Sequence, residues 1–322
     1  MLPTAVVNAT SHILLYHLHD PIGTPHIALC NTWATQLETH VLYHMPASGA
    51  ASSHLDSIEA NVMRYSSSQI RTRFPRVFNG SRGQHVSVYP RIVLWYEAHP
   101  GIRINHHHIW SIEKDAFFAG DVRRFFDIFA GDNADLVSSK FNVFGTKFFA
   151  FPPKTLLPVS VKRGNVSRLM HGLYGWSATE GVLWRQSIVE RASLNLLRRL
   201  RAWLDAGRAM HSEIFASTVC ALAAPRCTLS SWSALVPCAF GTGFNVNTKH
   251  YRALFPAWSN RTCGLMRRRW LHPLDVLKKS TVPKQVLGEL SECMRSHSAR
   301  VAPPSPPMPR ARRLGRFCNF DD

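Results

Sequence analysis

Apolar residues in the N-terminal part of the chain form short runs that alternate with stretches of helical spacing. The run over residues 12–18, which ends at Asp20-Pro21, predicts a strand followed by a turn. Helical spacing follows over residues 27–37, and the apolar residues 41–43 predict a second strand. Strands that alternate with helices in this order predict an α/β fold with a mostly parallel sheet and helical crossovers.

Further elements are expected along the rest of the chain. The pattern predicts a helix over 55–63, a loop over 66–90, a buried strand over 106–112, a helix capped by Asp121 over 122–129, and a strand over 134–139. The apolar stripe of residues 188–204, followed by Gly207, predicts the clearest helix of the chain. A second helix is expected over 212–224, and the remainder of the C-terminal third is irregular.

Composition and charge limit the class of protein. The chain has 322 residues, of which 45% are hydrophobic, and this excludes a disordered or fibrous protein. Its formal net charge of +18 allows anionic partners such as nucleic acid, acidic surfaces or nucleotide-bearing molecules. No stretch approaches the roughly 18 consecutive apolar residues of a membrane span. The N-terminus does not fit a signal peptide, so we expect either a cytoplasmic protein or a sequence that has lost a targeting segment.

Two features favour an exported protein. Four tripeptides fit the N-glycosylation pattern, beginning at Asn8, Asn79, Asn165 and Asn260. Most of the 7 cysteines lie in the C-terminal half and could pair in an oxidising compartment, although buried free thiols explain them equally well. None of their spacings is Cys-x-x-Cys, so a zinc ribbon is not expected.

The most informative segment for chemistry is Glu113-Lys114-Asp115, directly after the strand predicted over 106–112. Carboxylates at the end of a buried parallel strand lie at the sheet edge where α/β proteins bind ligands. There they can hold a hard divalent cation that neutralises a diphosphate leaving group. The alternative is a strand end whose charges simply meet solvent. His106-His107-His108 begins this predicted strand, and solvated histidines explain it better than a metal site.

The run "HIWSIEKDAFFAGDVRRFFDIF", followed by "ADLVSS", resembles the middle of GT-A-type nucleotide-sugar glycosyltransferases. The resemblance implies a Rossmann-like GT-A fold in which Asp115 binds a divalent metal, manganese or magnesium, that grips the diphosphate of the donor. It places Glu113 near the ribose or the donor sugar. The chain departs from the family pattern at Lys114, where many relatives carry an acid. A metal-independent or inactive protein is therefore the alternative.

Two later blocks extend the resemblance. "LWRQSIVERASLNLLRRL…GRAMHSEIFASTVCA" is similar to a block in an uncharacterised eukaryotic branch of such proteins, and implies that Glu213 is the catalytic base. Glu180 is the reserve candidate, and ordinary first-turn helix chemistry is the alternative for Glu213. His272, in "WLHPL", resembles the late histidine that completes the metal sphere, although a structural role is the alternative.

The sequence therefore predicts a catalytic domain over 1–285, with a donor half over 10–140 and an acceptor half over 141–285, and a basic, Pro-rich, disordered tail over 286–322. The expected function is transfer of a sugar from a nucleotide-sugar donor to a glycan or protein acceptor, in the Golgi lumen by resemblance. The alternatives are an inactive transferase fold and a basic protein that binds nucleic acid or acidic polysaccharide. Nucleic acid is the less favoured partner, because the basic residues are dispersed and no nucleic-acid-binding motif is present.

Overall fold

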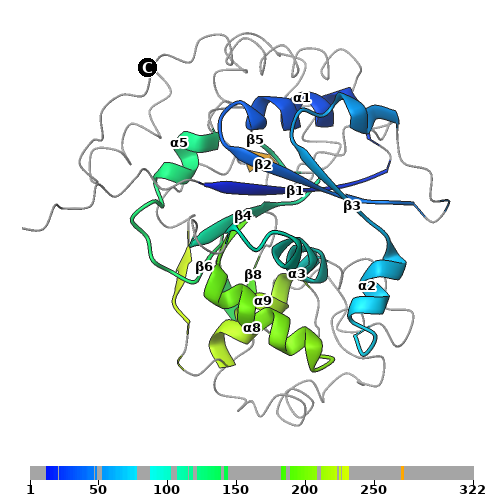
Figure 1. The fold of residues 1–322 in the computed structure, drawn as a ribbon. Helices are drawn as coiled ribbons and strands as arrows, with labels where there is room; N and C mark the ends of the chain where they lie inside the picture. Colours follow the sequence, from blue (N-terminus) through cyan, green and yellow to red (C-terminus); the bar gives the residue numbers. More distant parts are fainter. Residues whose placement is uncertain are drawn as a thin grey trace, which may run out of the picture. The chain divides into compact units, whose positions relative to one another are not determined.

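The structure is a computed structural model that describes residues 12–20, 22–46, 48, 53–77, 88–102, 107–114, 116–118, 122–138, 141–143, 183–185, 189–208, 212–222, 225, 227–231 and 270–271. It is a mixed α/β protein with a seven-stranded, mostly parallel sheet and flanking helices (Figure 1). This confirms the fold class expected from the alternation of strands and helices. Contacts divide the chain into two units: the first includes residues 1–66 and 109–132, and the second includes 67–108 and 133–231.

The first unit carries four parallel strands in the order β4-β1-β2-β3. Their bounds are Ile13–His19 for β1, Glu38–His44 for β2, Asn61–Tyr65 for β3 and His108–Ile112 for β4. In the register, Ile13 of β1 lies opposite Glu38 of β2 on one side and Ile109 of β4 on the other. The pairing of β2 with β3 is parallel, as are both pairings of β1. β1 is therefore an interior strand, which explains why six of its seven residues are buried and nearly all are apolar or aromatic.

Helix α1 (Thr24–Ala34) follows β1 and precedes β2 in the sequence, and it packs on these strands. The ring of Trp33 meets Tyr16 of β1 edge to face, with 5.1 Å between ring centroids. At the end of the helix, the Asn31 amide donates to the Ser57 carbonyl of the 3-10 helix η1 (Ser53–Ser57) and accepts from the Glu59 backbone N–H. These two hydrogen bonds fix the connection that leads into β3.

An aromatic cluster packs against β4. Helix α5 (Val122–Asp127) places Phe126 parallel to the Trp110 ring, with centroids 4.1 Å apart, and Phe125 and Phe129 meet the same ring at an angle. All four side chains are fully buried. Buried aromatic rings contribute strongly to a hydrophobic core, so this cluster fixes β4 in the first unit.

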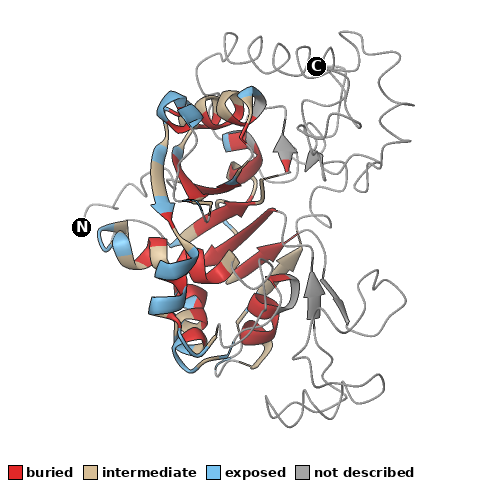
Figure 2. Ribbon diagram, turned by 90° about the vertical axis from the view of Figure 1, so that its right-hand side faces the viewer, coloured by how far each residue is buried: buried red, intermediate tan, exposed pale blue. Residues whose placement is uncertain are grey.

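The second unit contains four helices and five strands within the described residues. They are α2 (Ser67–Arg73), α3 (Val88–Ala98), β6 (Leu136–Ser138), β7 (Phe141–Val143), β8 (Leu183–Arg185), β9 (Val189–Ser193), α8 (Leu194–Asp205), α9 (Ser212–Leu222) and β10 (Leu229–Ser231). β6 pairs parallel with β10 and antiparallel with β9, and β7 pairs antiparallel with β8. In both units the buried residues gather on the strands and on the inner helix faces (Figure 2).

Helix α8 has the boundaries that its capping residues dictate. The Ser193 hydroxyl accepts from the Leu196 backbone N–H at its start and donates to Asp135, and Gly207 follows its end with φ of 75°. The apolar stripe predicted from the sequence is buried: Leu194, Leu196, Leu197, Leu200 and Leu204. A disulfide joins Cys220, in the last turn of α9, to Cys227, seven residues later.

Three sequence-based boundaries were wrong. Residues 61–63 lie in strand β3 rather than in the helix predicted over 55–63, because they pair with β2 as a partly exposed strand. Residues 189–193 form β9 rather than the first turns of a helix, because they pair with β6 and Ser193 caps the helix only afterwards. The loop predicted over 66–90 contains helix α2 and the start of α3.

We expect Gly207→Ala to destabilise the protein by about 2 kcal/mol or more, since a left-handed conformation costs a non-glycine residue roughly 1–2 kcal/mol. A Cβ at this position would also lie 2.7 Å from the Cβ of Arg76. Urea denaturation measures the change. Gly101→Ala is the matched control, because an added Cβ there has no neighbour within 4 Å. Equal stability of the two variants would contradict this account of Gly207.

Candidate functional site

The carboxyl ends of β1 and β4 form the topological switch point of the parallel strands. From β1 the chain proceeds to β2 and β3 on one side, and β4 then pairs on the opposite side of β1. Loops that leave two such strands diverge, and α/β proteins bind ligands in the crevice outside them. The residues that follow these strands are Asp20 after β1, and Glu113 and Lys114 after β4.

Asp20 is oriented by a neighbouring strand. The hydroxyl of Tyr43, near the carboxyl end of β2, donates to its Oδ2 atom at 2.8 Å. Tyr43 is fully buried, whereas Asp20 is half-buried. The carboxylate is thus held by a rigid group while it keeps contact with solvent at the sheet edge. Sequence reasoning used Asp20 only as a turn signal; an acid directly after an apolar strand was the signal that could have identified it.

Lys114 is tied to β1 by its side chain and its backbone. Its Nζ atom donates to the His19 carbonyl at 2.7 Å, and its own carbonyl accepts from the Tyr16 hydroxyl at 2.7 Å. The preceding residue, Glu113, is half-buried. Its backbone carbonyl accepts a hydrogen bond from the Ala116 backbone N–H, which closes a turn. These contacts place a positive charge at the end of β1, beside the position that Asp20 occupies in the chain.

A buried polar pair links β1 and β4 within the sheet. The Nε2 atom of His17 lies 2.9 Å from the Ser111 hydroxyl, and both residues are less than 5% exposed. Ser111 lies opposite Leu15 in the register, so it shares a face of the sheet with His17. This pair holds the two strands together just inside the edge that carries Asp20 and Lys114.

A short strand pair joins two segments that are far apart in the sequence. β5 (Phe117–Phe118) pairs antiparallel with β11 (Trp270–Leu271), and Leu271 lies opposite Phe117. The predicted metal ligands Asp115 and His272 lie outside the described residues. Phe117 follows the first by two positions in the chain, and Leu271 directly precedes the second. The pairing therefore brings together the two segments from which the predicted ligands come.

The predicted base Glu213 is the second residue of α9, in the second unit, and its side chain lies outside the described residues. Phe215, two residues later, packs on the ring of Tyr89 of α3, with 5.6 Å between centroids. The Tyr89 hydroxyl donates to Glu190 of β9 at 2.5 Å, and Glu190 is only 1% exposed. The start of α9 is thus fixed by a buried aromatic contact and a buried hydrogen bond.

Other candidate groups do not extend the site. His107 is exposed at the start of β4, which agrees with a solvated histidine, and His106 lies outside the described residues. Burial raises the pKa of the Cys30 thiol, so it remains protonated and unreactive. Within the described part of the chain, no group of three or more His, Cys, Asp or Glu side chains is arranged to hold a metal ion. None of the described helices is both long and apolar enough to cross a membrane.

Comparison with known proteins gives similarity in structure but none in sequence. No protein-family model matches the chain, and no curated protein matches its sequence. The crystal structure of mouse xyloside xylosyltransferase 1, in its apo form, aligns with 85% of this chain and 99% of its own, at a TM-score of 0.33 and 10% sequence identity. Similarity at this level is no argument for a shared activity, so the function must be argued from the residues of the site.

The hydrogen bond between Tyr43 and Asp20 should appear as an energetic coupling in a double-mutant cycle. We expect Tyr43→Phe and Asp20→Ala to couple by about 1 kcal/mol in the free energy of unfolding, because each change removes the same partly buried bond. Urea denaturation of the wild type, both single variants and the double variant measures it. Additive effects, with coupling below about 0.3 kcal/mol, would mean that Tyr43 does not orient Asp20.

Proposed function

We propose that the protein is a GT-A-type glycosyltransferase that binds the diphosphate of a nucleotide-sugar donor at the carboxyl ends of β1 and β4. The observation that carries this proposal is the pairing of β5 with β11. It sets Leu271, which directly precedes His272 in the chain, opposite Phe117, which follows Asp115 by two positions. A strand pair between two segments this far apart in the sequence supports a ligand-binding edge here more than it supports solvated strand ends.

The residue types at this edge fit a divalent metal. Carboxylate oxygens suit manganese or magnesium, so Asp115 would hold the ion. By the family resemblance, His272 would be its second protein ligand and Glu113 would lie beside the ribose or the donor sugar. The metal would neutralise the negative charge of the departing diphosphate. The ammonium group of Lys114 stands at the same edge, 2.7 Å from the His19 carbonyl, and adds positive charge there. Lys114 therefore complements a leaving group of high negative charge rather than abolishing the site.

The remaining roles follow from position and chemistry. The carboxylate of Asp20, oriented by Tyr43, accepts hydrogen bonds from donor hydroxyl groups. Glu213 serves as the base: it takes the proton of the acceptor hydroxyl as the acceptor oxygen bonds to the anomeric carbon, and the bond from that carbon to the diphosphate oxygen breaks. The acceptor is a glycan or a glycoprotein hydroxyl.

The cellular setting is the secretory pathway, with the Golgi lumen as the preferred site and the cytoplasm as the alternative. The disulfide between Cys220 and Cys227 supports an oxidising compartment, because disulfides are rare in the cytosol. The four glycosylation tripeptides agree with the same compartment.

The donor site can be tested by thermal unfolding of the purified chain with UDP, GDP and their sugar conjugates, with and without manganese. A ligand at about a hundredfold its Kd stabilises the folded state by about 2.7 kcal/mol. We expect one nucleotide to raise the Tm in a manganese-dependent manner, and we expect Asp115→Ala to lose the manganese-dependent part. His272→Ala should reduce the same part of the shift.

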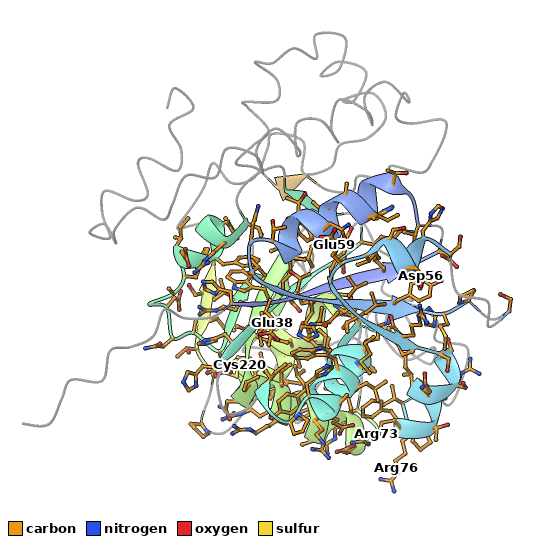
Figure 3. All side chains as sticks on the ribbon, turned by 45° about the horizontal axis from the view of Figure 1, so that its top comes forward. Glu38, Asp56, Glu59, Arg73, Arg76 and Cys220 are labelled. Carbon is orange, nitrogen blue, oxygen red and sulfur yellow. A yellow bond between two sulfur atoms is a disulfide. The ribbon has the colours of Figure 1, made fainter. Side chains whose placement is uncertain are left out.

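Glu59→Gln is the matched control. Glu59 is an exposed carboxylate of the first unit (labelled in Figure 3). It lies just before β3, at the amino end of this strand and not at a carboxyl end. Its removal should leave the nucleotide shift unchanged. If the nucleotide and manganese raise the Tm of Asp115→Ala as much as that of the wild type, and this variant transfers sugar normally, the proposed metal role is wrong. If no nucleotide shifts the folded wild-type protein, the transferase proposal itself fails.

A further inference from the structure

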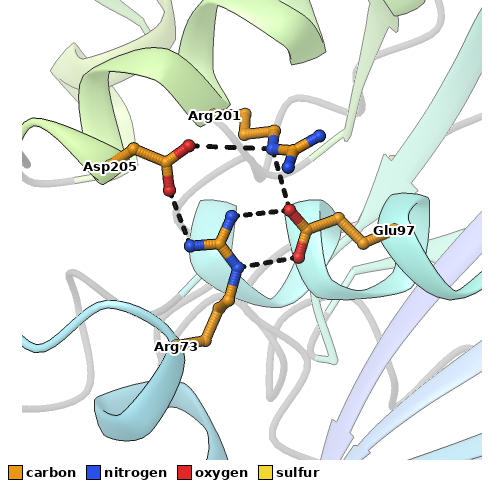
Figure 4. Close-up of polar contacts among 4 residues, drawn as sticks. All are labelled: Arg73, Glu97, Arg201 and Asp205. Carbon is orange, nitrogen blue, oxygen red and sulfur yellow. Dashed lines mark hydrogen bonds and ion pairs between the residues drawn. The ribbon is translucent and has the colours of Figure 1, made fainter.

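Four charged side chains of the second unit form a closed ring between helices α2, α3 and α8 (Figure 4). The guanidinium of Arg73 donates to both carboxylate oxygens of Glu97, at 2.9 and 2.7 Å, and to Asp205 at 2.6 Å. The Nε atom of Arg201 lies 2.8 Å from Glu97 and 3.7 Å from Asp205. Hydrogen bonds to Glu97, and then to Asp205, raise the pKa of Arg73 above its usual value. Two cations and two anions balance, so the ring is neutral.

Exposed arginines flank the two arginines of this neutral ring in the sequence. Arg71 and Arg76 flank Arg73 in α2 and the turn after it, and Arg198 and Arg208 flank Arg201 in α8 and just beyond its end; all four are exposed. No acidic residue occurs in positions 67–77, and Asp205 is the only one in positions 194–208. The charge of Arg71, Arg76, Arg198 and Arg208 is therefore not offset by acids of their own elements.

Two of these arginines, Arg76 and Arg208, pack against residues at or near the end of α8. Arg76 packs directly on Gly207, because a Cβ added to Gly207 would lie 2.7 Å from the Cβ of Arg76. The guanidinium of the next residue, Arg208, lies over the ring of Trp203, 5.5 Å from its centroid. Arg76 itself projects outward from the ribbon (Figure 3). Arg71 and Arg198 thus stand on helices, whereas Arg76 and Arg208 lie just beyond helix ends and pack against Gly207 and Trp203.

We propose that Arg71, Arg76, Arg198 and Arg208, here called the arginine surface, bind an acidic polysaccharide. A guanidinium offers a planar set of donors that matches carboxylate and sulfate groups with two parallel hydrogen bonds. Cations fixed at several positions on rigid helices suit a ligand that repeats its anionic groups along a chain. The surface lies within the second unit, so this proposal is independent of the donor site in the first.

Features of the same unit favour a polysaccharide over nucleic acid or a membrane. Stacking of bases needs an open aromatic face, and the face of Trp203 is occupied by Arg208. The apolar residues of α2 and α8 that could enter a bilayer, Ile70 and the leucine stripe, are buried. The disulfide at the end of α9 indicates an oxidising compartment, where acidic glycans occur.

Binding of a fluorescently labelled heparin oligosaccharide, followed by anisotropy over a range of salt, tests the proposal on the full chain. We expect Arg76→Gln/Arg208→Gln to weaken affinity about tenfold and to lower the slope of log affinity against log salt by about two, one for each arginine replaced. The control Arg64→Gln/Arg123→Gln removes two exposed arginines of the first unit and the same charge. It should weaken affinity less than about twofold if position matters rather than net charge.

Arg71→Gln/Arg198→Gln provides a second test that leaves the packing on Gly207 and Trp203 intact. It should weaken heparin affinity about as much as Arg76→Gln/Arg208→Gln does, and its thermal unfolding should match that of the wild type. Equal weakening in the control and the test variants would contradict the proposal, as would heparin affinity that none of the variants changes. Tighter binding of an RNA oligonucleotide, or of vesicles that contain phosphatidylserine, through the same arginines would also overturn it. Sugar transfer is not part of this readout, so its result stands whether or not the donor site is active.

Discussion

The parallel pairing of β1 with β4 is the constraint on which the candidate donor site depends. Because β2 occupies the other side of β1, the chain must leave β1 and β4 in different directions, and the ends of these strands are exposed to a ligand. The buried contact between His17 and Ser111 joins the two strands just inside that edge. Asp20 and Lys114 are placed by the same pairing, through Tyr43 on one side and the His19 carbonyl on the other.

The two units treat charge in different ways, and this difference gives each a distinct chemistry. In the first unit, Asp20 and Lys114 stand at the ends of parallel strands, where the buried Tyr43 holds the first and the His19 carbonyl the second. In the second unit, Glu97 and Asp205 neutralise only two of the arginines on α2 and α8. The net charge of +18, which is dispersed along the sequence, thus includes a local excess on two neighbouring helices. The proposed donor and the proposed polysaccharide would each be bound by one of these two arrangements.

The sequence predicted the parts of the fold whose residues are buried and apolar. β1 and β4 were predictable because both consist almost wholly of such residues, whereas β3 has a partly exposed pattern that gives no apolar run. β9 was missed because buried charged residues, Glu190 and Arg191, interrupt its apolar pattern. The role of Asp20 depends on a contact with Tyr43, 23 positions later, which no local pattern contains. The pairing of β5 with β11 is equally non-local, so the link between their segments came only from resemblance.

Hydrogen–deuterium exchange with and without manganese and the bound nucleotide tests the central claim most directly, because it reports where the ligand lies without any assumption about turnover. The account predicts slower exchange in peptides that cover the ends of β1 and β4, residues 16–22 and 112–118, and in the segment that follows β11. Helices α2 and α8 should exchange as before. Protection confined to α2 and α8, or none at the ends of β1 and β4 while the nucleotide is bound, would contradict the donor site proposed at the switch point.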